Sequence, residues 1–332
     1  MDTNFTLGVS EMIGTSDKMQ LLFNKIDKVA KTDTSVLLYG ETGTGKDMVA
    51  RRIHSLSSRA KYPFVARNCS ALPSNLVESL LFGTSRGSYT GAEDSIGVFE
   101  AANNGTVFLD EINSMSTELQ AKLLRVLENK RVVRVGETIY RPINVRIITA
   151  MNENPQKCIR DNLLRPDIYY RLAGVQLYLP PLRERRKDIP LLVNFYIGKY
   201  NEIMGKNIKD ISPEVKKIFS RYQWPGNIRE LRNIIEGSMN FADGRYITPE
   251  DLPDYIKEDQ YEDSDEYVLS KVISDNPDMC LNDYMAICEK AYISKKMEDF
   301  DSLSDLAYYL GISKQTLNYK LKKYGLGTKS KK

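Results

Sequence analysis

The chain has 332 residues, of which 42% are hydrophobic and 27% are charged. These proportions are those of a globular protein and exclude a disordered chain, and the length suits about two domains. No apolar run reaches the roughly 18 residues that a membrane-spanning helix requires, and the first residues lack the pattern of a signal peptide. The cysteines have no CxxC spacing, which is typical of reduced thiols, and the single histidine, His54, excludes a His-rich metal site. We therefore expect a cytoplasmic protein. We also expect His54 to be a structural residue.

Charge is unevenly distributed along the chain, although the net charge is only +3. Residues 254–266 contain seven acidic residues and one lysine, whereas residues 306–332 contain seven lysines and no acidic residue. An acidic connector followed by a basic module is typical of nucleic-acid-binding proteins. An acidic loop followed by a lysine-rich tail would give the same pattern, so charge alone leaves both interpretations open.

Short apolar runs alternate with polar or helical sequence over the first half of the chain. The runs 36–39, 64–67, 106–109 and 145–150 are rich in β-forming residues, and a helical pattern begins near Lys46. This alternation predicts an α/β domain with a mainly parallel sheet that is covered by helices on both faces.

The character of the sequence changes after residue 181. Apolar residues between 187 and about 256 recur with helical periodicity, and Pro213 follows Ser212, a favourable N-cap residue. We predict a smaller helical domain here. Two or three further helices are expected between about residues 282 and 324.

A glycine-rich segment lies between the first predicted strand and the following helix. Its sequence is Gly-Glu-Thr-Gly-Thr-Gly-Lys. Glycines allow backbone N–H groups to surround a phosphate, the helix N-terminus adds positive potential, and Lys46 can reach the β- and γ-phosphates. Asp47 stands where the generic motif has a serine or threonine that binds magnesium, and its carboxylate can hold the ion through water. The predicted phosphate-binding residues are Gly40, Glu41, Thr42, Gly43, Thr44, Gly45, Lys46 and Asp47.

Two acidic residues follow another apolar run further along the chain. The run 106–109 is succeeded by Asp110 and Glu111. At the end of a strand, Asp110 can bind Mg²⁺ and Glu111 can polarise an attacking water. Adjacent acidic residues are common by chance, but in combination with the segment 40–46 they indicate a P-loop ATPase that uses ATP and Mg²⁺.

Five segments occur in an order that resembles one known family. They are residues 40–47, GSYTGA at 87–92, residues 105–112, LPPLRERRKD at 179–188 and WPGNIREL at 224–231. Over residues 13–253 the sequence is similar to the AAA+ domain of bacterial enhancer-binding proteins, the sigma-54-dependent transcriptional activators. The resemblance implies an AAA+ P-loop ATPase fold with a parallel sheet and a helical lid. It also accounts for Asp47, because the phosphate loop of that family ends in an acidic residue.

The segment GSYTGA corresponds to the GAFTGA loop with which this family contacts sigma-54. Ser88 replaces an alanine of that motif and Tyr89 replaces a phenylalanine. Tyrosine keeps the aromatic ring, so the resemblance implies that the contact survives, and an exposed aromatic among glycines suits a mobile contact loop. A surface turn with a packed tyrosine is the alternative. The implied contact residues are Gly87, Ser88, Tyr89, Thr90, Gly91 and Ala92.

The resemblance implies further catalytic residues. Asn68, which follows the run 64–67, matches an asparagine that restrains the catalytic glutamate, although a turn-capping role suits it nearly as well. Arg165 and Arg171 match two arginines that reach the γ-phosphate bound by a neighbouring subunit. Such an arginine accelerates hydrolysis by roughly 10³–10⁵-fold.

Four more residues are implied to lie around the nucleotide. Asn152 matches a polar sensor at the end of a strand, and Arg229 matches the sensor arginine of the lid. Ile13 and Gly14 stand where the family lines the adenine pocket.

The C-terminal part of the chain has the pattern of a helix-turn-helix. A short helical run reaches a turn at Gly311, and a second helix over 314–324 follows Ser313 as its N-cap, with Leu317 and Leu321 facing inward. The pattern is similar to the Fis-type module of the same family, in which polar side chains of the second helix contact the major groove. A basic helical hairpin used for dimerisation is the alternative. The predicted DNA-contacting residues are Ser313, Lys314, Gln315, Thr316, Asn318, Tyr319, Lys320 and Lys323.

We predict five segments along the chain and one combined function. The segments are an N-terminal extension (1–12), an AAA+ α/β subdomain (13–183), an AAA+ helical lid (184–256), an acidic linker (257–280) and a helix-turn-helix domain (281–332). The predicted function is that of an ATP-dependent transcriptional activator, which binds upstream double-stranded DNA, assembles from dimers into a ring (a hexamer by resemblance) and remodels sigma-54 RNA polymerase.

Two alternative functions stay open. The first is a DNA-binding AAA+ regulator that does not act through sigma-54, and the second is an AAA+ machine that remodels protein or DNA. The retained residues 90–92 argue against the first, and the helix-turn-helix argues against the second. Only about a dozen residues precede the AAA+ segment, so we expect no receiver or ligand-sensing domain in this chain. Either a separate regulatory protein controls the activator, or the chain is a shortened form of a longer protein.

Overall fold

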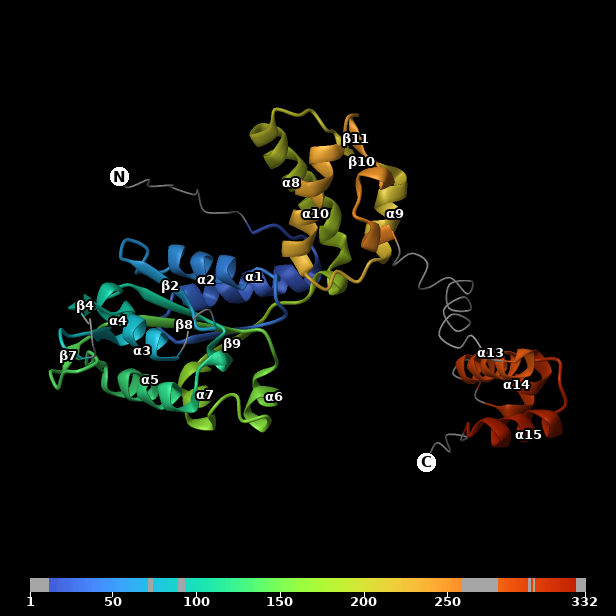
Figure 1. Cartoon of the computed structure of the whole chain (residues 1–332), viewed down its shortest axis with the longest axis horizontal. Coiled ribbons are helices and arrows are strands. Elements are labelled where there is room, and N and C mark those ends of the chain that lie inside the picture. The colour runs from blue at the N-terminus through green and yellow to red at the C-terminus, as the bar shows by residue number, and fades with distance from the viewer. Residues whose placement is uncertain are drawn as a thin grey trace. The chain divides into compact units, whose positions relative to one another are not determined.

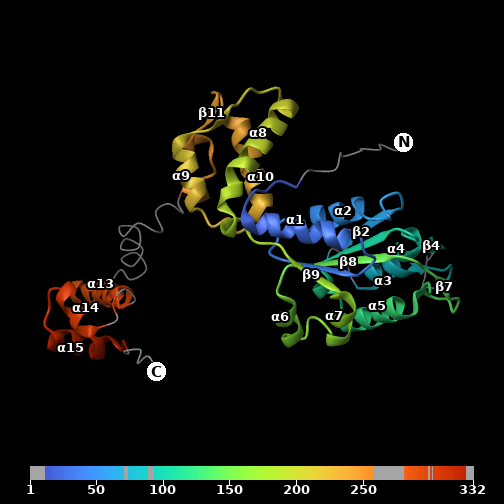
Figure 2. The ribbon, with the colours of Figure 1, turned by 180° about the vertical axis from the view of Figure 1, so that it is seen from behind.

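The structure, a computed structural model, describes residues 12–70, 74–88, 93–257, 280–297, 300 and 302–326. The chain folds as two units, Met1–Lys257 and Glu258–Lys332 (Figures 1 and 2). Each unit has its own buried apolar residues, so each is described by itself.

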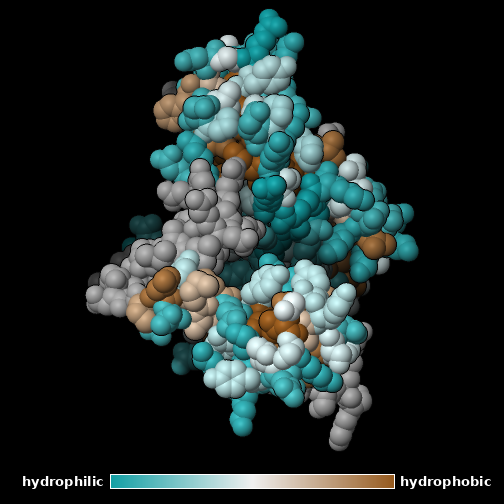
Figure 3. Space-filling model, turned by 90° about the vertical axis from the view of Figure 1, so that its right-hand side faces the viewer, coloured by the Kyte–Doolittle hydropathy of each residue, from teal (hydrophilic) through white to brown (hydrophobic). Residues whose placement is uncertain are grey.

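On the face shown in Figure 3, hydrophilic residues predominate and hydrophobic residues form small separate patches. Among the residues that the structure describes, no helix combines the length and the apolar composition needed to cross a membrane. Apolar side chains are instead collected in internal clusters.

A parallel sheet forms the centre of the first unit. Its strand order is β2-β5-β8-β1-β9, and every neighbouring pair is parallel. The four predicted strands are confirmed, with ends that differ by one residue at most. The sequence does not predict β9, because in this edge strand only Leu177 is fully buried and no apolar run marks it. The strands are β1 (Val36–Tyr39), β2 (Phe64–Asn68), β5 (Thr106–Asp110), β8 (Arg146–Met151) and β9 (Val175–Tyr178).

Helices cover both faces of this sheet, as predicted. Successive side chains of a strand point to opposite faces, so Val36 and Leu38 join one apolar cluster and Leu37 joins the other. α1 and α2 cover the first face, and α3 to α7 cover the second (Figures 1 and 2). The helices are α1 (Asp17–Ala30), α2 (Lys46–Ser55), α3 (Ser74–Phe82), α4 (Val98–Ala101), α5 (Thr117–Asn129), α6 (Pro155–Arg160) and α7 (Pro166–Leu172).

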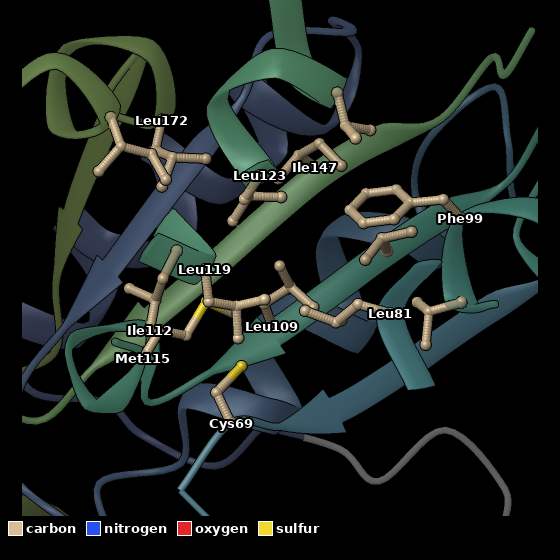
Figure 4. Packing of buried hydrophobic residues seen from close by; sticks show 14 of the residues in the cluster. Cys69, Leu81, Phe99, Leu109, Ile112, Met115, Leu119, Leu123, Ile147 and Leu172 are labelled. Carbon is tan, nitrogen blue, oxygen red and sulfur yellow. The ribbon is translucent and has the colours of Figure 1, made fainter. Parts of the chain in front are cut away.

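The cluster beneath α3 to α7 is shown in Figure 4. Leu81 and Phe99 pack with Leu109 of β5 and Ile147 of β8, and Leu123 of α5 lies over them. All five side chains are buried. Since burying such a side chain contributes about 1.5–3 kcal/mol, the cluster holds the strands and their carboxyl ends in a fixed register.

The histidine and the cysteines have the structural character expected of them. His54 is 8% exposed, and its Nδ1 lies 2.9 Å from the Thr106 hydroxyl oxygen, which confirms its structural role. Cys69, Cys158, Cys280 and Cys288 are all free thiols.

A helical lid follows the sheet in the first unit. Its apolar cluster includes the buried Trp224, whose indole Nε1 donates a 3.0 Å hydrogen bond to the Phe219 carbonyl oxygen. Ser212 caps α9 as predicted, because its hydroxyl accepts a hydrogen bond from the Val215 N–H. The lid elements are α8 (Ile189–Met204), β10 (Asp210–Ile211), α9 (Pro213–Arg221), α10 (Asn227–Phe241), β11 (Tyr246–Ile247) and the 3₁₀ turn η4 (Pro249–Asp251).

Short elements connect these layers. β3 pairs with β4 and β6 pairs with β7, both antiparallel, and a bridge between Thr84 and Val135 joins the two pairs. The short strands and 3₁₀ turns are β3 (Gly83–Thr84), β4 (Ser95–Ile96), β6 (Arg131–Val132), β7 (Arg141–Pro142), η1 (Ile112–Ser114), η2 (Leu182–Glu184) and η3 (Arg186–Asp188).

The described part of the second unit consists of three helices, α13 (Leu281–Lys296), α14 (Leu303–Tyr309) and α15 (Lys314–Tyr324). Leu317 and Leu321 are buried between them, as predicted. Gly311, at φ 66°, forms the turn between α14 and α15. The Ser313 hydroxyl accepts a 3.0 Å hydrogen bond from the Thr316 N–H and so caps α15. The predicted helix-turn-helix is therefore present.

Candidate functional site

The carboxyl ends of the parallel strands meet at one edge of the sheet. β1 ends at Tyr39 before the glycine-rich segment, β5 ends at Asp110, and β8 ends at Met151 immediately before Asn152. β2 and β5 pair so that Asn68 lies beside Asp110. The topology thus brings together residues that the sequence places in distant segments.

The glycine-rich segment curls into a loop from which α2 starts. Gly43 (φ 79°) and Gly45 (φ 102°) adopt left-handed backbone conformations that favour glycine. The Lys46 side chain folds over the loop, with Nζ 2.6 Å from the Gly40 carbonyl oxygen and 3.0 Å from that of Glu41. Lys46 is only 8% exposed. A buried cation beside the N-terminus of a helix is the arrangement that binds phosphate.

A buried cation and two partly buried acidic residues lie at this edge of the sheet. Burial lowers the pKa of Lys46, while Asp110 and Glu111 act in the opposite direction. Burial raises the pKa of Asp110, while Lys46 lowers it. Arg229, in the first turn of α10, is exposed, and its positive charge also lowers the pKa of Lys46, so the predicted sensor arginine lies on the same side. This balance of charge suits an anion that binds together with a divalent cation.

Asp110 is the carboxylate that fits a magnesium ion. Magnesium commonly binds one or two protein carboxylates and completes its coordination with waters and phosphate oxygens. Among the described residues, no group of three or more His, Cys, Asp or Glu could hold a metal ion by itself. Asp110, at the end of β5, therefore fits an ion that is held jointly with phosphate groups. Asp47, the second predicted magnesium residue, is exposed and pairs with Arg51 at 2.8 Å, and its charge also raises the pKa of Asp110. Its role in holding the ion through water stays a prediction.

The predicted catalytic glutamate lies in a turn. Glu111 has φ 55°, a conformation that is uncommon for a residue other than glycine, and its N–H donates a 3.0 Å hydrogen bond to Asp110 Oδ1. The Asn68 side-chain oxygen accepts hydrogen bonds from the Ser70 N–H (2.7 Å) and hydroxyl (2.8 Å). This is the turn-capping arrangement considered for Asn68, and its restraint of Glu111 stays a prediction.

Asn113 is a site residue that the sequence did not single out. It lies in η1, and its Nδ2 donates a 3.2 Å hydrogen bond to Oδ1 of Asn152, the predicted sensor. The Asn113 Oδ1 atom is buried and has no protein partner among the described residues. Asn113 thus orients the Asn152 amide. Its only sequence signal is a polar residue two positions after Glu111, which is too common to be informative.

An apolar cavity lies beside the phosphate loop. Ile13 and Met19 border it on one side, Ile228 borders it from the lid, and Thr44 and Gly45 border it from the loop. The cavity is about 40 Å³, which is smaller than a ligand pocket, so Ile13 lies beside the phosphate loop and its contact with adenine stays a prediction.

Gly14 occupies a narrow space near this cavity. A Cβ atom there would lie 2.9 Å from Met19 Cγ and 3.2 Å from Asp188 Oδ2. Asp188 Oδ1 in turn accepts hydrogen bonds from the N–H groups of Thr15 (2.7 Å) and Ser16 (2.8 Å). The segment before α1 is thereby anchored to the start of the lid.

Several of the predicted phosphate-binding residues make contacts to the lid side. The Glu41 carboxylate pairs with Arg183. The Thr42 carbonyl oxygen accepts a 3.0 Å hydrogen bond from Asn227 Nδ2. Thr44 stabilises the loop itself, because its hydroxyl donates a 2.7 Å hydrogen bond to the Glu41 carbonyl oxygen.

The two predicted trans-acting arginines lie at the two ends of α7. Arg165 occupies the N-cap position, makes no capping hydrogen bond with its side chain, and pairs with Asp167 at 2.7 Å. Arg171 is exposed, and Ser35, immediately before β1, donates a 3.1 Å hydrogen bond to its carbonyl oxygen. With Lys130, Arg171 borders a cavity of about 370 Å³. Arg171 therefore lies at the amino end of β1, whereas the phosphate loop follows its carboxyl end.

The predicted sigma-54 contact loop is described only in part. Of its residues, Gly87 and Ser88 are described, whereas Tyr89, Thr90, Gly91 and Ala92 lie outside the described residues. At the base of the loop, the Thr84 hydroxyl donates a 2.7 Å hydrogen bond to the Glu93 carbonyl oxygen. Ser88 also lies against the β6–β7 connection, since a Cβ atom at Gly136 would lie 2.5 Å from Ser88 Cβ.

The exposed side of α15 carries most of the predicted DNA-contacting residues. Those exposed are Ser313, Lys314, Gln315, Thr316, Asn318, Tyr319 and Lys323. Lys320 differs from the expectation, because its ammonium group lies 2.5 Å from Glu289 Oε1 of α13. It faces the neighbouring helix, so this lysine is engaged within the unit.

Comparisons with known proteins agree with this geometry. The Sigma-54 interaction domain matches residues 12–178, the AAA+ ATPase lid domain matches residues 183–268, and the bacterial regulatory protein, Fis family, matches residues 285–324. The chain is 45% identical over 322 residues to the transcriptional activator RocR of Bacillus subtilis, with 96% of this chain and 69% of RocR covered. The chain belongs to the family of sigma-54-dependent transcriptional activators.

Further similarities support this family and the fold. The chain is 41% identical to the regulatory protein AtoC of Escherichia coli, over 90% of this chain and 64% of AtoC. It is 37% identical to the phenol regulator MopR of Acinetobacter guillouiae, over 95% of this chain and 56% of MopR. The crystal structure of NtrX from Brucella abortus in complex with ADP superposes with a TM-score of 0.69 and 33% identity, over 95% of this chain and 69% of NtrX. The predicted AAA+ fold with a helical lid and a C-terminal helix-turn-helix is confirmed.

Proposed function

We propose that this sigma-54 activator hydrolyses ATP in the presence of Mg²⁺ and uses the reaction to remodel sigma-54 RNA polymerase, so that a promoter opens. The observation that carries the proposal is the gathering of Lys46, Asp110 and Glu111 beside the phosphate loop. The NtrX structures, one in complex with ADP and one in complex with ATP, support a purine nucleotide as the ligand.

Each residue of the nucleotide site has a distinct task in this proposal. The loop N–H groups and Lys46 bind the β- and γ-phosphates, and Ile13 contacts the base. Asp110 holds Mg²⁺, which supplies charge neutralisation at the phosphates when it is bound. Glu111 orients and polarises the attacking water, and Asn152 contacts the γ-phosphate side of the site.

Arg165 and Arg171 act on the nucleotide of a neighbouring subunit. The position of Arg171 at the amino end of β1 supports this assignment, because that end is opposite to the chain's own phosphate loop. A head-to-tail contact of this kind generates a ring when its rotation closes. We therefore propose a homo-oligomer, assembled from dimers, in which residues 13–256 form the ring.

DNA binding and polymerase contact use other parts of the chain. The exposed side of α15, within residues 281–332, enters the major groove of upstream double-stranded DNA. Residues 87–92 contact sigma-54, with Tyr89 supplying most of the contact area. The family membership and the helix-turn-helix geometry support these two assignments.

The test is steady-state ATP hydrolysis by the purified chain with Mg²⁺, followed by transcription from a sigma-54 promoter. Asp110→Ala should abolish hydrolysis, because the carboxylate that holds the metal is lost. Asp27→Ala is the control, because this exposed carboxylate of α1 pairs with Arg52 and belongs to no part of the proposed site, and its effect should be much smaller. Hydrolysis by Asp110→Ala at the parental rate would refute the assignment of the metal site.

A further inference from the structure

A short segment between β9 and α8, here called the strap, contacts both the phosphate loop and the lid. We define the strap as residues 182–188, which comprise η2 and η3 and lead into α8. Its side chains point in different directions: Arg183 contacts the phosphate loop, Asp188 contacts the segment before α1, and Arg186 donates hydrogen bonds to the Ser220 carbonyl oxygen and to Gln223 in the lid. The strap is therefore in contact with the phosphate loop, the segment before α1 and the lid.

One of these contacts joins Arg183 to Glu41. The two guanidinium Nη atoms lie 2.7 Å and 2.5 Å from the two carboxylate oxygens, a bidentate pair. Such pairs have greater geometric specificity than single ion pairs. The hydrogen bonds from Arg183 hold the pKa of Glu41 below its usual value, so the carboxylate is charged at neutral pH.

Asn227 of the lid completes the same contact. It is fully buried and has φ 54°, and its Oδ1 accepts a 2.7 Å hydrogen bond from the Leu182 N–H of the strap. Its Nδ2 donates to the Thr42 carbonyl oxygen at 3.0 Å and to Glu41 Oε2 at 3.3 Å. One buried side chain at the start of α10 thus binds the strap and the phosphate loop simultaneously.

The backbone of α10 also contacts the loop directly. The Ile228 N–H donates a 3.0 Å hydrogen bond to the Gly43 carbonyl oxygen. A Cβ atom at Gly43 would lie 2.2 Å from the Gly226 carbonyl oxygen, so no side chain could be accommodated there. The loop glycine is required by the lid as well as by the phosphate site.

From this geometry we propose that Glu41 is a positioning residue that couples the phosphate loop to the lid through Arg183 and Asn227, and is not itself a nucleotide ligand. Closure of the loop on phosphate moves the start of α10 with it, and this brings Arg229, two residues beyond Asn227, to the nucleotide. The inference deepens the proposed ATP hydrolysis and rests on it.

Charge reversal of the pair provides the test. We compare the parent chain with Glu41→Arg, Arg183→Glu and the double variant, and include Glu41→Gln, which keeps an acceptor for Asn227 without the charge. The measurements are kcat and KM for ATP, melting temperature, and hydrogen–deuterium exchange of residues 226–231 with and without a non-hydrolysable ATP analogue and Mg²⁺. In the parent, the analogue should slow exchange both in the phosphate loop and at the start of α10.

Each single reversal should uncouple the two regions. The analogue should still protect the phosphate loop but no longer the start of α10, and the KM for ATP should rise by roughly 10-fold, as expected for a coupling of ordinary size. The double variant should recover most of the parental KM and of the protection at α10. Glu41→Gln should lie between the parent and the single reversals.

The matched control is the ion pair between Lys122 and Glu78, which lie 2.6 Å apart on α5 and α3 and contact neither the loop nor the lid. Lys122→Glu should leave KM and lid protection at parental values. Single reversals at Glu41 and Arg183 that bind and hydrolyse ATP like the parent, or a folded double variant that is as impaired as the singles, would overturn the proposal. A parent chain that does not bind the analogue would instead overturn the proposed ATPase function, so the two failures are distinguishable.

Discussion

The phosphate loop and the DNA-facing helix α15 are built in opposite ways. At the loop, Lys46 is 8% exposed and Asn227 is fully buried, and each makes several hydrogen bonds to fixed backbone groups. On α15, Tyr319 is 68% exposed and its neighbours lie on the open face of a small core. The phosphate loop depends on a single arrangement of buried, hydrogen-bonded side chains. The exposed face of α15 instead consists of side chains that are independent of one another. We therefore expect single substitutions to have large effects at the loop and small effects on the exposed face of α15.

Lys46→Ala should produce the largest loss. Removal of the buried ammonium group takes away the cation that faces the phosphates, and turnover should fall by roughly 10³-fold or more. DNA affinity should be unchanged, because α15 belongs to the other unit. Steady-state hydrolysis and DNA binding measured on the same preparation check both parts. A parental rate of hydrolysis would contradict the site.

Arg171→Ala should also suppress turnover, but in a way that a mixture can rescue. If the residue acts between subunits, specific activity of the parent rises with protein concentration as rings form. A mixture of Arg171→Ala with Lys46→Ala should regain part of the activity, because each variant supplies the residue that the other lacks. Activity that does not depend on concentration, together with no recovery on mixing, would show that Arg171 does not act in trans.

Leu317→Ala tests whether the second unit depends on its core. Leu317 is fully buried in a cluster of few residues, so its truncation should cost about 2–5 kcal/mol and lower the melting temperature of that unit. DNA binding should be lost while ATP hydrolysis persists. The exposed Tyr308→Ala on α14 is the control, with little expected change in stability. Unaltered melting of Leu317→Ala would contradict the described packing.

The smallest effects are expected on the exposed face of α15. Gln315→Ala should weaken specific DNA binding by about 1–3 kcal/mol, since a side-chain contact to a base edge is lost. Lys314→Ala should reduce the salt dependence of affinity by about one unit in log–log slope. Lys320→Ala is the matched control, because its ammonium group is engaged with Glu289, and it should change the slope less. Equal slopes for the two lysine variants would contradict this distinction.

The sequence predicted those features whose chemistry is local. Lys46 and Asp110 follow apolar runs in short motifs, and Ser313 precedes a helix with a regular apolar pattern, so each could be placed without long-range information. β9 was missed because an edge strand needs few apolar residues. Asn113 was missed, and the lid contact of Glu41 was not anticipated, since both depend on partners far away in the chain, Asn152 and Arg183. The engagement of Lys320 likewise depends on how α13 packs on α15.

The central claim is that this chain opens sigma-54 promoters in an ATP-dependent manner through residues 87–92. The most direct measurement is open-complex formation on a linear sigma-54 promoter with purified chain, sigma-54 RNA polymerase, ATP and Mg²⁺. The parent and Tyr89→Phe should form open complexes, because the ring is retained and a hydroxyl hydrogen bond contributes only about 1 kcal/mol. Tyr89→Ala should form none while it still hydrolyses ATP and binds DNA. Open complexes formed equally by Tyr89→Ala and the parent, or by neither the parent nor Tyr89→Phe, would contradict the account.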